Sequence, residues 1–230
     1  AATAGLGSIP RFIYKNRIKA SLCVLVPPQV RSSLALAKHD LLANEMKVSV
    51  VIPLYNKEKS VLRAVNSVLN QTEQDFELIV VNDGSTDNSA ALVAGSCDGT
   101  KVRLVDQDNA GVSVARNKGV AEAHSDLIAF LDADDEWHPE FLKTILDLRF
   151  EFPEACVFGT SYSFQYKDGA LSQPKTSHLF ETGYQGLLDN FLEILRIGLP
   201  FNSSSFAVIK SAYEVAGGFP VGIKYGEDVD

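Results

Sequence analysis

The sequence predicts an α/β fold in which a mostly parallel sheet is flanked by helices on both faces. Two observations carry this prediction. From residue 48 onward, apolar runs of strand length alternate with helical patterns, and such alternation is typical of right-handed βαβ crossovers. The run at 127–131 is apolar without polar alternation, which indicates a strand buried on both faces. A chain of 230 residues can form one such domain with appendages.

The first part of the predicted domain consists of four strands, each followed by a helix. In the first helix, Val61, Val65 and Val68 recur at helical spacing and share one face. Asp87 suits the N-cap of the second helix, and Pro139 suits the first position of the fourth. The predicted strands are at 48–53, 76–82, 101–106 and 127–131, and the helices at 57–70, from about 88, at about 111–123 and from 139 towards 150.

After Pro153 the alternation becomes less regular. A strand near 155–165 precedes a stretch with glycine, serine and proline at 167–177, which we expect on the surface. The remaining predicted elements are a helix at 184–197, a strand at 204–209 and a short helix at 210–216.

The sequence before the first strand has a different character. Met46 is the only methionine and directly precedes that strand, so we expect residues 46–230 to form the domain and residues 1–45 to be a non-native or upstream-translated extension. Two alternatives remain open. Basic residues before the apolar run at 22–26 are compatible with a targeting segment, although a Pro-Pro pair ends that run. A helix over 31–44 is the second alternative.

Charge and cysteine content exclude several classes of protein. The net charge is −8, and outside residues 1–45 fifteen Lys and Arg face twenty-seven Asp and Glu. Nucleic-acid binding needs a basic face, so we expect no nucleic-acid partner. The three cysteines are widely spaced, which disfavours a zinc site or a disulfide framework and favours a reducing compartment. No apolar run approaches transmembrane length.

Acidic residues crowd together directly after the buried strand at 127–131. Asp132 and Asp134 are followed by Asp135 and Glu136. Ligands bind beyond the carboxyl ends of strands in open α/β sheets, and crowded carboxylates repel one another unless a cation lies between them. An EF-hand is excluded because a tryptophan stands where the loop needs glycine. The cluster therefore predicts a metal and a phosphate-bearing ligand at this edge.

Two other predicted strands end in polar groups at the same edge. The first ends in Pro53-Leu54-Tyr55-Asn56, and the second ends beside Asp83. The Asp83 carboxylate can accept hydrogen bonds from a base or a ribose. Taken alone, this aspartate is explained better by an Asx-turn or a cap in an ordinary Asp-Gly loop.

Taken together, the motifs resemble those of family 2 glycosyltransferases. The resemblance runs in order from residue 48 to the end of the chain, and several motifs in order are far more specific than one. The motifs are Val-Val-Ile-Pro-Leu-Tyr-Asn at 50–56, Leu-Ile-Val-Val-Asn-Asp-Gly-Ser-Thr-Asp at 78–87, Asn-Ala-Gly-Val-Ser-Val-Ala-Arg-Asn-Lys-Gly at 109–119, Phe-Leu-Asp-Ala-Asp-Asp at 130–135, Gly-Gly-Phe at 217–219 and Gly-Glu-Asp at 226–228.

The resemblance implies a GT-A fold and a transfer, with inversion, of a sugar from a nucleotide-diphosphate sugar, commonly a UDP-sugar. It also implies which residues contact the donor. Asp83 would contact the base, Arg116 would form part of the donor wall, and Pro53, Tyr55 and Asn56 would line the nucleotide pocket.

The same resemblance assigns the metal and the chemistry. Asp134 would hold Mg²⁺ or Mn²⁺ on the diphosphate, with Asp132 near the ribose and the metal and Asp135 as a second-choice ligand. Asp228 matches the catalytic base of the family, and Glu227 would lie beside the acceptor. Without the resemblance, the Glu-Asp pair would be interpreted as the acidic start of a helix.

The sequence departs from the family pattern at its end, where no helix stop or turn signal occurs. We therefore expect the domain to be truncated at its C-terminus, where family members carry further acceptor contacts and sometimes membrane helices. The expected acceptor is a saccharide or lipid-linked saccharide, as in bacterial polysaccharide or glycoconjugate synthesis. The expected location is the cytoplasm, with the inner face of the membrane as an alternative. A non-catalytic nucleotide- or carbohydrate-binding fragment remains the alternative function.

Overall fold

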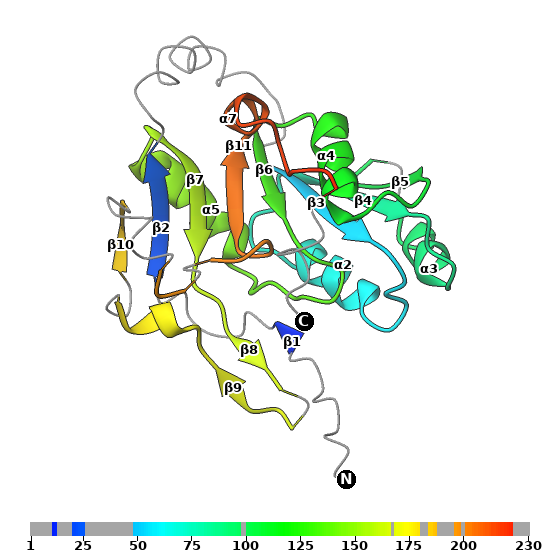
Figure 1. The fold of residues 1–230 in the computed structure, drawn as a ribbon, viewed down its shortest axis with the longest axis horizontal. Helices are drawn as coiled ribbons and strands as arrows, with labels where there is room; N and C mark the ends of the chain where they lie inside the picture. The colour runs from blue at the N-terminus through cyan, green and yellow to red at the C-terminus, as the bar shows by residue number, and fades with distance from the viewer. Residues whose placement is uncertain are drawn as a thin grey trace.

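The fold was obtained as a computed structural model of the 230-residue chain (Figure 1). It is an α/β fold in which a large sheet has helices packed on both faces, together with a small three-stranded sheet at one edge. The residues that the structure describes are 11–12, 20–25, 48–97, 100–166, 168–179, 184–187, 196–198 and 201–222.

Among the described residues, eight strands form the large sheet. They are β2 (Ala20–Leu25), β3 (Val48–Leu54), β4 (Phe76–Asp83), β5 (Val102–Gln107), β6 (Leu127–Phe130), β7 (Ala155–Thr160), β10 (Tyr184–Leu187) and β11 (Phe206–Ile209). Their order is β10-β2-β7-β11-β6-β3-β4-β5. The neighbouring strands β6, β3, β4 and β5 pair in parallel, and so do β10 and β2. Strand β11 is antiparallel to its neighbours β6 and β7, and β7 is antiparallel to β2.

The central strands are buried on both faces, as predicted from their unbroken apolar runs. Along β3, Val50 and Ile52 belong to one hydrophobic core and Val51 to the other, because successive side chains point to opposite faces of a sheet. The helices α2 (Val61–Leu69) and α5 (Phe141–Glu151) pack into the first core, and α4 (Val112–Glu122) into the second. The predicted helices on both faces are therefore confirmed.

Helix α4 lies especially close to the sheet. A Cβ atom added at Gly119 would lie 2.3 Å from Cγ1 of Val51, so the absence of a side chain lets the helix approach β3. The remaining helices are α3 (Ser89–Ala94), which follows β4, and α7 (Lys210–Val215), which follows β11. In the described part of the chain, no helix is long and apolar enough to cross a membrane.

Beyond β7 the structure differs from the sequence prediction in two places. The strand predicted at 155–165 leaves the large sheet after Thr160 and resumes as β8 (Phe164–Gln165), which pairs with β9 (Leu171–Ser172) inside the predicted surface stretch. A 3-10 helix, η2 (Lys175–Leu179), follows. The helix predicted at 184–197 is wrong at its start, because residues 184–187 form β10 and pair with β2. Gly186 weakens a helix at this point, and the partner strand supplies the hydrogen bonds.

Residues 11–12 and 20–25 are the described part of the predicted extension. The first pair forms β1 (Arg11–Phe12), which pairs with β8, and the second forms β2, which lies between β7 and β10. The helix considered over 31–44 lies outside the described residues. Whether residues 1–45 are an extension to an independent domain stays a prediction, and a deletion experiment below tests it.

Candidate functional site

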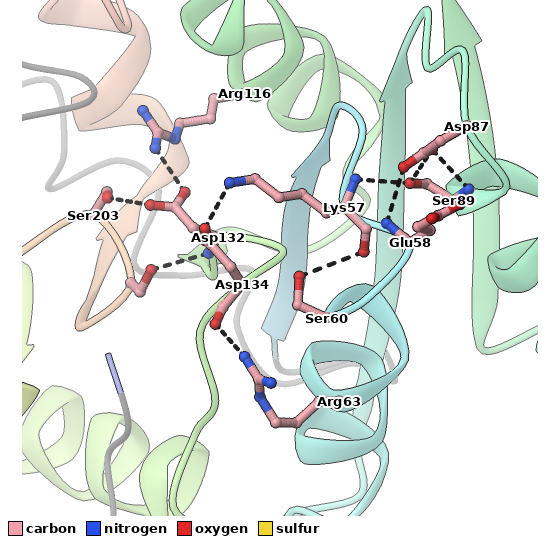
Figure 2. Close-up of polar contacts among 11 residues, drawn as sticks. Lys57, Glu58, Ser60, Arg63, Asp87, Ser89, Arg116, Asp132, Asp134 and Ser203 are labelled. Carbon is pink, nitrogen blue, oxygen red and sulfur yellow. Dashed lines mark hydrogen bonds and ion pairs between the residues drawn. The ribbon is translucent and has the colours of Figure 1, made fainter. Parts of the chain in front are cut away.

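The carboxyl ends of β3, β4 and β6 meet at one edge of the sheet, and the loops that follow them form the candidate site (Figure 2). Asn56, after β3, connects the first two loops. Its side-chain oxygen accepts hydrogen bonds from the Thr86 main chain at 2.8 Å and the Asp87 main chain at 3.3 Å. Its φ of 51° lies in the left-handed region, where asparagine is one of the few tolerated residues. Asn56 thus fixes the loop after β4 against the loop after β3.

Asp83 closes β4 and is 3% exposed. Its Oδ1 accepts hydrogen bonds from Nε2 of Gln107 at 2.7 Å and the main-chain N–H of Ala110 at 2.8 Å, and its Oδ2 accepts one from the Gly111 N–H at 2.9 Å. The carboxylate therefore holds the turn that leads into α4. A carboxylate has about four acceptor positions, and these hydrogen bonds occupy three of them.

Pro53 and Tyr55 flank the end of β3 in different environments. Pro53 is buried in the strand, in register with Val81. Tyr55 is 47% exposed. A large exposed aromatic ring beside Asn56 and Asp83 provides a flat apolar surface on which a base can stack.

Asp132 is held by residues from two distant parts of the chain. Its Oδ1 accepts a hydrogen bond from Arg116 at 2.7 Å and its Oδ2 from the Ser203 hydroxyl at 2.7 Å, while its main-chain N–H donates to Oγ of Ser204 at 3.0 Å. Figure 2 shows Arg116 and Ser203 on either side of the carboxylate. Arg116 is 2% exposed and also lies over the ring of Phe219, 4.9 Å from its centre. Both oxygens of Asp132 already have protein partners.

Asp134 is the more accessible carboxylate of the pair. The Nζ of Lys57 lies 2.6 Å from its Oδ2, and Arg63 donates to its main-chain oxygen. Its side chain is 46% exposed. The arrangement brings a cationic group from the loop after β3 to the loop after β6. Asn56, Asp83, Asp132 and Asp134, which were predicted from separate motifs, therefore lie along one edge.

Asp135 lies behind these carboxylates and is 2% exposed. Burial, and next the negative charge of Asp132, raise the pKa of the Asp135 carboxyl well above its ordinary value. Within the described part of the chain, its Oδ1 has no hydrogen-bond partner. The raised pKa favours the neutral form of Asp135, which therefore adds little negative charge beside Asp132 and Asp134.

The residues at this edge fit a divalent cation held by few protein ligands. Across the described residues, no group of three or more His, Cys, Asp or Glu side chains could hold a metal ion. Magnesium commonly takes only one or two protein carboxylates and keeps several waters. The Lys57 ammonium places a positive charge 2.6 Å from Oδ2 of Asp134.

A second connection reaches α4 from the end of the described chain. Asn117 accepts a hydrogen bond from the Phe219 N–H at 2.9 Å and donates one to the Phe219 carbonyl at 2.9 Å. The Tyr213 hydroxyl also donates to the Asn117 side chain. We call this set the Asn117 clamp. A Cβ atom at Gly218 would lie 2.8 Å from Oδ1 of Asn117, so the Gly-Gly-Phe motif is shaped for this contact.

The candidate catalytic residue Asp228 and the candidate acceptor-binding residue Glu227 lie outside the described residues. Their roles stay predictions. The chain that leads to them is described up to residue 222, and the Asn117 clamp fixes that chain at Phe219.

With this geometry in place, comparison with known proteins decides the family. The profile of the family described as glycosyl transferase family 2 matches residues 49–214, which is more than half of the chain. The chain belongs to glycosyltransferase family 2.

Curated glycosyltransferases are similar to this chain over part of their length. An uncharacterized glycosyltransferase of Nostoc sp. is 40% identical over 126 residues, which are 54% of this chain and 38% of that protein. Glycosyltransferase GlyA of Streptococcus pneumoniae is 32% identical over 124 residues, which are 54% of this chain and 18% of that protein. The chain therefore spans less than half the length of either relative.

Solved glycosyltransferase structures share the fold. Residues 1–349 of TarS of Staphylococcus aureus, in complex with UDP-GlcNAc, have a TM-score of 0.60 and 22% identity, covering 80% of this chain and 51% of that chain. The mannosyltransferase PcManGT of Pyrobaculum calidifontis, in complex with GDP-Man and Mn²⁺, has a TM-score of 0.56 and 20% identity, covering 84% and 54%. These likenesses confirm the predicted GT-A fold.

Sequence reasoning missed several residues that shape this family 2 site. Lys57 and Arg63 contact Asp134, and Ser203 and Ser204 contact Asp132. Lys57 carried a weak signal, since it directly follows the Tyr-Asn motif and an acidic cluster needs positive charge nearby. The serines carried none, because they lie about seventy residues beyond Asp132 in an ordinary polar run.

Proposed function

We propose that the chain contains the donor-binding part of an enzyme that transfers a sugar from a nucleotide-diphosphate sugar to an acceptor hydroxyl. One observation carries this proposal. At the edge where three strand ends meet, Lys57 and Arg63 contact Asp134, and Arg116 contacts Asp132. Cationic side chains bind phosphate oxygens strongly, and carboxylates bind a divalent cation that phosphate also binds. A diphosphate bound with a cation matches both sets of groups.

The donor we propose is a UDP-sugar. TarS, which shares the fold, has been solved with UDP-GlcNAc, whereas PcManGT has been solved with GDP-Man. Tyr55 offers an exposed ring for stacking on the base. Asp83 would accept a hydrogen bond from a base N–H at its remaining acceptor position. Pro53 and Asn56 would complete the nucleotide pocket, with Arg116 on the side of the diphosphate.

Asp134, with Asp132 as its neighbour, would hold the Mg²⁺ or Mn²⁺ ion in this proposal. A bound divalent cation supplies Lewis-acid stabilisation of the negative charge on the leaving diphosphate. The Lys57 side chain is 44% exposed and lies on a surface loop, and in this proposal its ammonium would turn from Asp134 towards a phosphate when the ion binds. Arg116 is buried and keeps Asp132 oriented in both states.

The chemical step would depend on Asp228, which the family resemblance identifies as the base. Its carboxylate would take the proton of the acceptor hydroxyl as the oxygen attacks the anomeric carbon, and one displacement inverts that carbon. General-base catalysis of this kind contributes about a hundred- to ten-thousand-fold. Glu227 would lie beside the acceptor, a saccharide or lipid-linked saccharide of a polysaccharide or glycoconjugate. The cytoplasm, or the inner face of the membrane, remains the proposed location.

Titration with UDP and Mn²⁺ by calorimetry tests the donor site. We expect the unmodified chain to bind UDP in a Mn²⁺-dependent manner and Asp134→Asn to lose that dependence, because it removes the accessible carboxylate. Asp75→Asn is the matched control, since Asp75 is exposed at the opposite end of β4. Undiminished UDP affinity with Mn²⁺ in Asp134→Asn would count against the metal assignment.

Turnover of a chain extended past Asp230 tests the catalytic assignment. We expect Asp228→Asn to keep UDP affinity and to lose transfer from a panel of nucleotide-sugars by at least about a hundredfold. The extended unmodified chain could instead bind UDP but release no nucleoside diphosphate from any nucleotide-sugar, with or without added acceptors. In that case the non-catalytic binding fragment replaces the enzyme as the proposed function.

A further inference from the structure

A cavity of about 420 Å³ lies outside the donor site. Its walls come from the chain after β7, the β8–β9 hairpin and the start of η2, and they include Tyr162, Phe164, Tyr166, Ser172, Gln173 and Lys175. The volume falls within the range of about 300–1,000 Å³ that is common for small-molecule sites.

The cavity opens at the same edge of the sheet as the donor site. Strands β7 and β6 are both antiparallel to β11, so β7 and β6 run in the same direction and their carboxyl ends share one edge. Figure 1 shows β8 and β9 beyond that end of β7. A ligand in the cavity would therefore lie on the side of the sheet edge where Asp132 follows β6.

Short contacts connect the cavity wall to Asp132. The Thr160 N–H, two residues before Tyr162, donates to the Ser205 carbonyl at 2.8 Å. Ser203, two residues before Ser205, donates to Oδ2 of Asp132 at 2.7 Å. The cavity and the Asp132 carboxylate are thus separated by two short, hydrogen-bonded segments.

The lining of the cavity combines aromatic rings and the apolar Pro174 and Ile197 with polar side chains. Tyr162 and Phe164 meet edge to face, with ring centres 5.3 Å apart. Tyr166 is 43% exposed, and its hydroxyl lies 3.3 Å from Oγ of Ser172. A sugar ring has apolar C–H faces, which pack on aromatic rings, and a rim of hydroxyls, which need donors and acceptors. Ser172, Gln173 and Lys175 provide such groups.

We propose that this cavity is a saccharide-binding subsite that holds the acceptor sugar of the transfer, an assignment that rests on the proposed function. An aliphatic lipid chain suits the site less well, because it would bury the Ser172 and Gln173 side chains without hydrogen bonds. The acceptor sugar bound on the rings near Tyr166 would approach the donor from the β7 side of Asp132.

Saturation-transfer NMR on the 230-residue chain tests this proposal. The probes are the methyl glycosides of glucose, galactose, mannose and N-acetylglucosamine, together with octyl glucoside. Tyr166→Ala removes the exposed ring, and Tyr166→Phe keeps the ring without its hydroxyl. Phe150→Ala is the matched control, because Phe150 is a 90% exposed aromatic residue on α5 outside the cavity. UDP affinity with Mn²⁺ is measured on the same samples.

We expect at least one methyl glycoside to show saturation of its ring protons with the unmodified chain, Tyr166→Phe and Phe150→Ala, and to lose it with Tyr166→Ala. UDP affinity should be equal in all four proteins. No saturation from any glycoside, or equal saturation with Tyr166→Ala, would overturn the subsite. Saturation of the alkyl protons of octyl glucoside, rather than its ring protons, would overturn the saccharide subsite in favour of a lipid site. Loss of UDP binding in the unmodified chain would instead overturn the proposed donor site.

Discussion

The part of the chain from β3 to α5 and the part from β7 onward are built in different ways. In the first part, each strand pairs with another from the same stretch of sequence, and β3, β4 and β6 are buried along their length. In the second part, β7 pairs with β2 and β11, and β10 pairs with β2, so the partners come from both ends of the chain. The strands of the first part find partners within that part, whereas the strands of the second part need partners from distant segments of the chain.

Exposure follows the same division. Among the described residues, seven of the nine exposed large apolar side chains follow β7, including Leu171, Ile197 and Val215, whereas Tyr55 and Phe150 are the two in the first part. Helix α7 has no buried residue, whereas α2 and α5 each bury several. Local stability rises with the number of buried apolar contacts. We therefore expect the first part to resist opening and the second part to open at lower free energy.

The largest effect is expected in the first part, at Glu77. Its side chain is 1% exposed. Burial by itself would raise the pKa of the Glu77 carboxyl, but hydrogen bonds from Ser49, His124 and Arg103 outweigh burial and lower the pKa below its ordinary 4.5. A carboxyl with a lowered folded-state pKa stabilises the fold above its unfolded-state pKa and loses that contribution as pH falls through the folded-state pKa.

We therefore expect Glu77→Gln to lower the free energy of unfolding by about 2–3 kcal/mol at neutral pH, where the charged hydrogen bonds are lost. The difference from the unmodified chain should shrink as the pH falls below the ordinary 4.5 and through the lower folded-state pKa, where Glu77 also becomes protonated in the folded protein. Urea unfolding at neutral and acidic pH measures both values. Glu154→Gln, at an exposed position, is the control. An equal loss at every pH would show that the Glu77 charge is not involved.

A smaller effect is expected at the Asn117 clamp, which joins the two parts. Asn117→Ala removes both hydrogen bonds to the Phe219 main chain, at a cost of about 1 kcal/mol. Hydrogen exchange should increase in β11 and α7 and remain unchanged in β3 and β4. Asn66→Ala, on the exposed face of α2, should change neither region. Faster exchange in β3 as well would mean that the two parts open together.

The smallest effect is expected from deletion of residues 1–45. Burial is described from residue 48 onward, and the members of both hydrophobic cores lie between residues 48 and 219. If residues 1–45 are an extension, the melting temperature should remain nearly unchanged. The deletion also removes β2, which pairs with β7, so β7 would lose a neighbouring strand. A fall of several degrees would show that β2 is an integral strand of the domain.

The sequence was most informative where structure depends on local patterns. The strands predicted at 48–53, 76–82 and 127–131 match β3, β4 and β6 within about a residue, because buried parallel strands are short unbroken apolar runs. The shared edge of Asn56, Asp83 and Asp134 was also predictable, since parallel strands that end in polar groups place them on one side of a sheet.

The rest could not be predicted because it depends on contacts between distant residues. Residues 184–187 join β2, a strand more than 150 residues earlier, and no local pattern indicates such a partner. Ser203 and Ser204 reach Asp132 only because β11 lies beside β6 and brings the preceding turn to its end. Tertiary pairing overrides local propensity at such positions.

The dependence of Asp132 on Ser203 and Ser204 has a consequence for protein synthesis. These serines follow Asp132 by 71 and 72 residues, so Asp132 is already outside the ribosome for some time before either hydroxyl is made. The early strands can collapse into a folded core during this interval, since chains fold from the N-terminus as they emerge. The aspartate gains its full set of partners only when β11 is translated, and a nascent chain that stops before residue 203 would carry an assembled core with an unfinished binding edge.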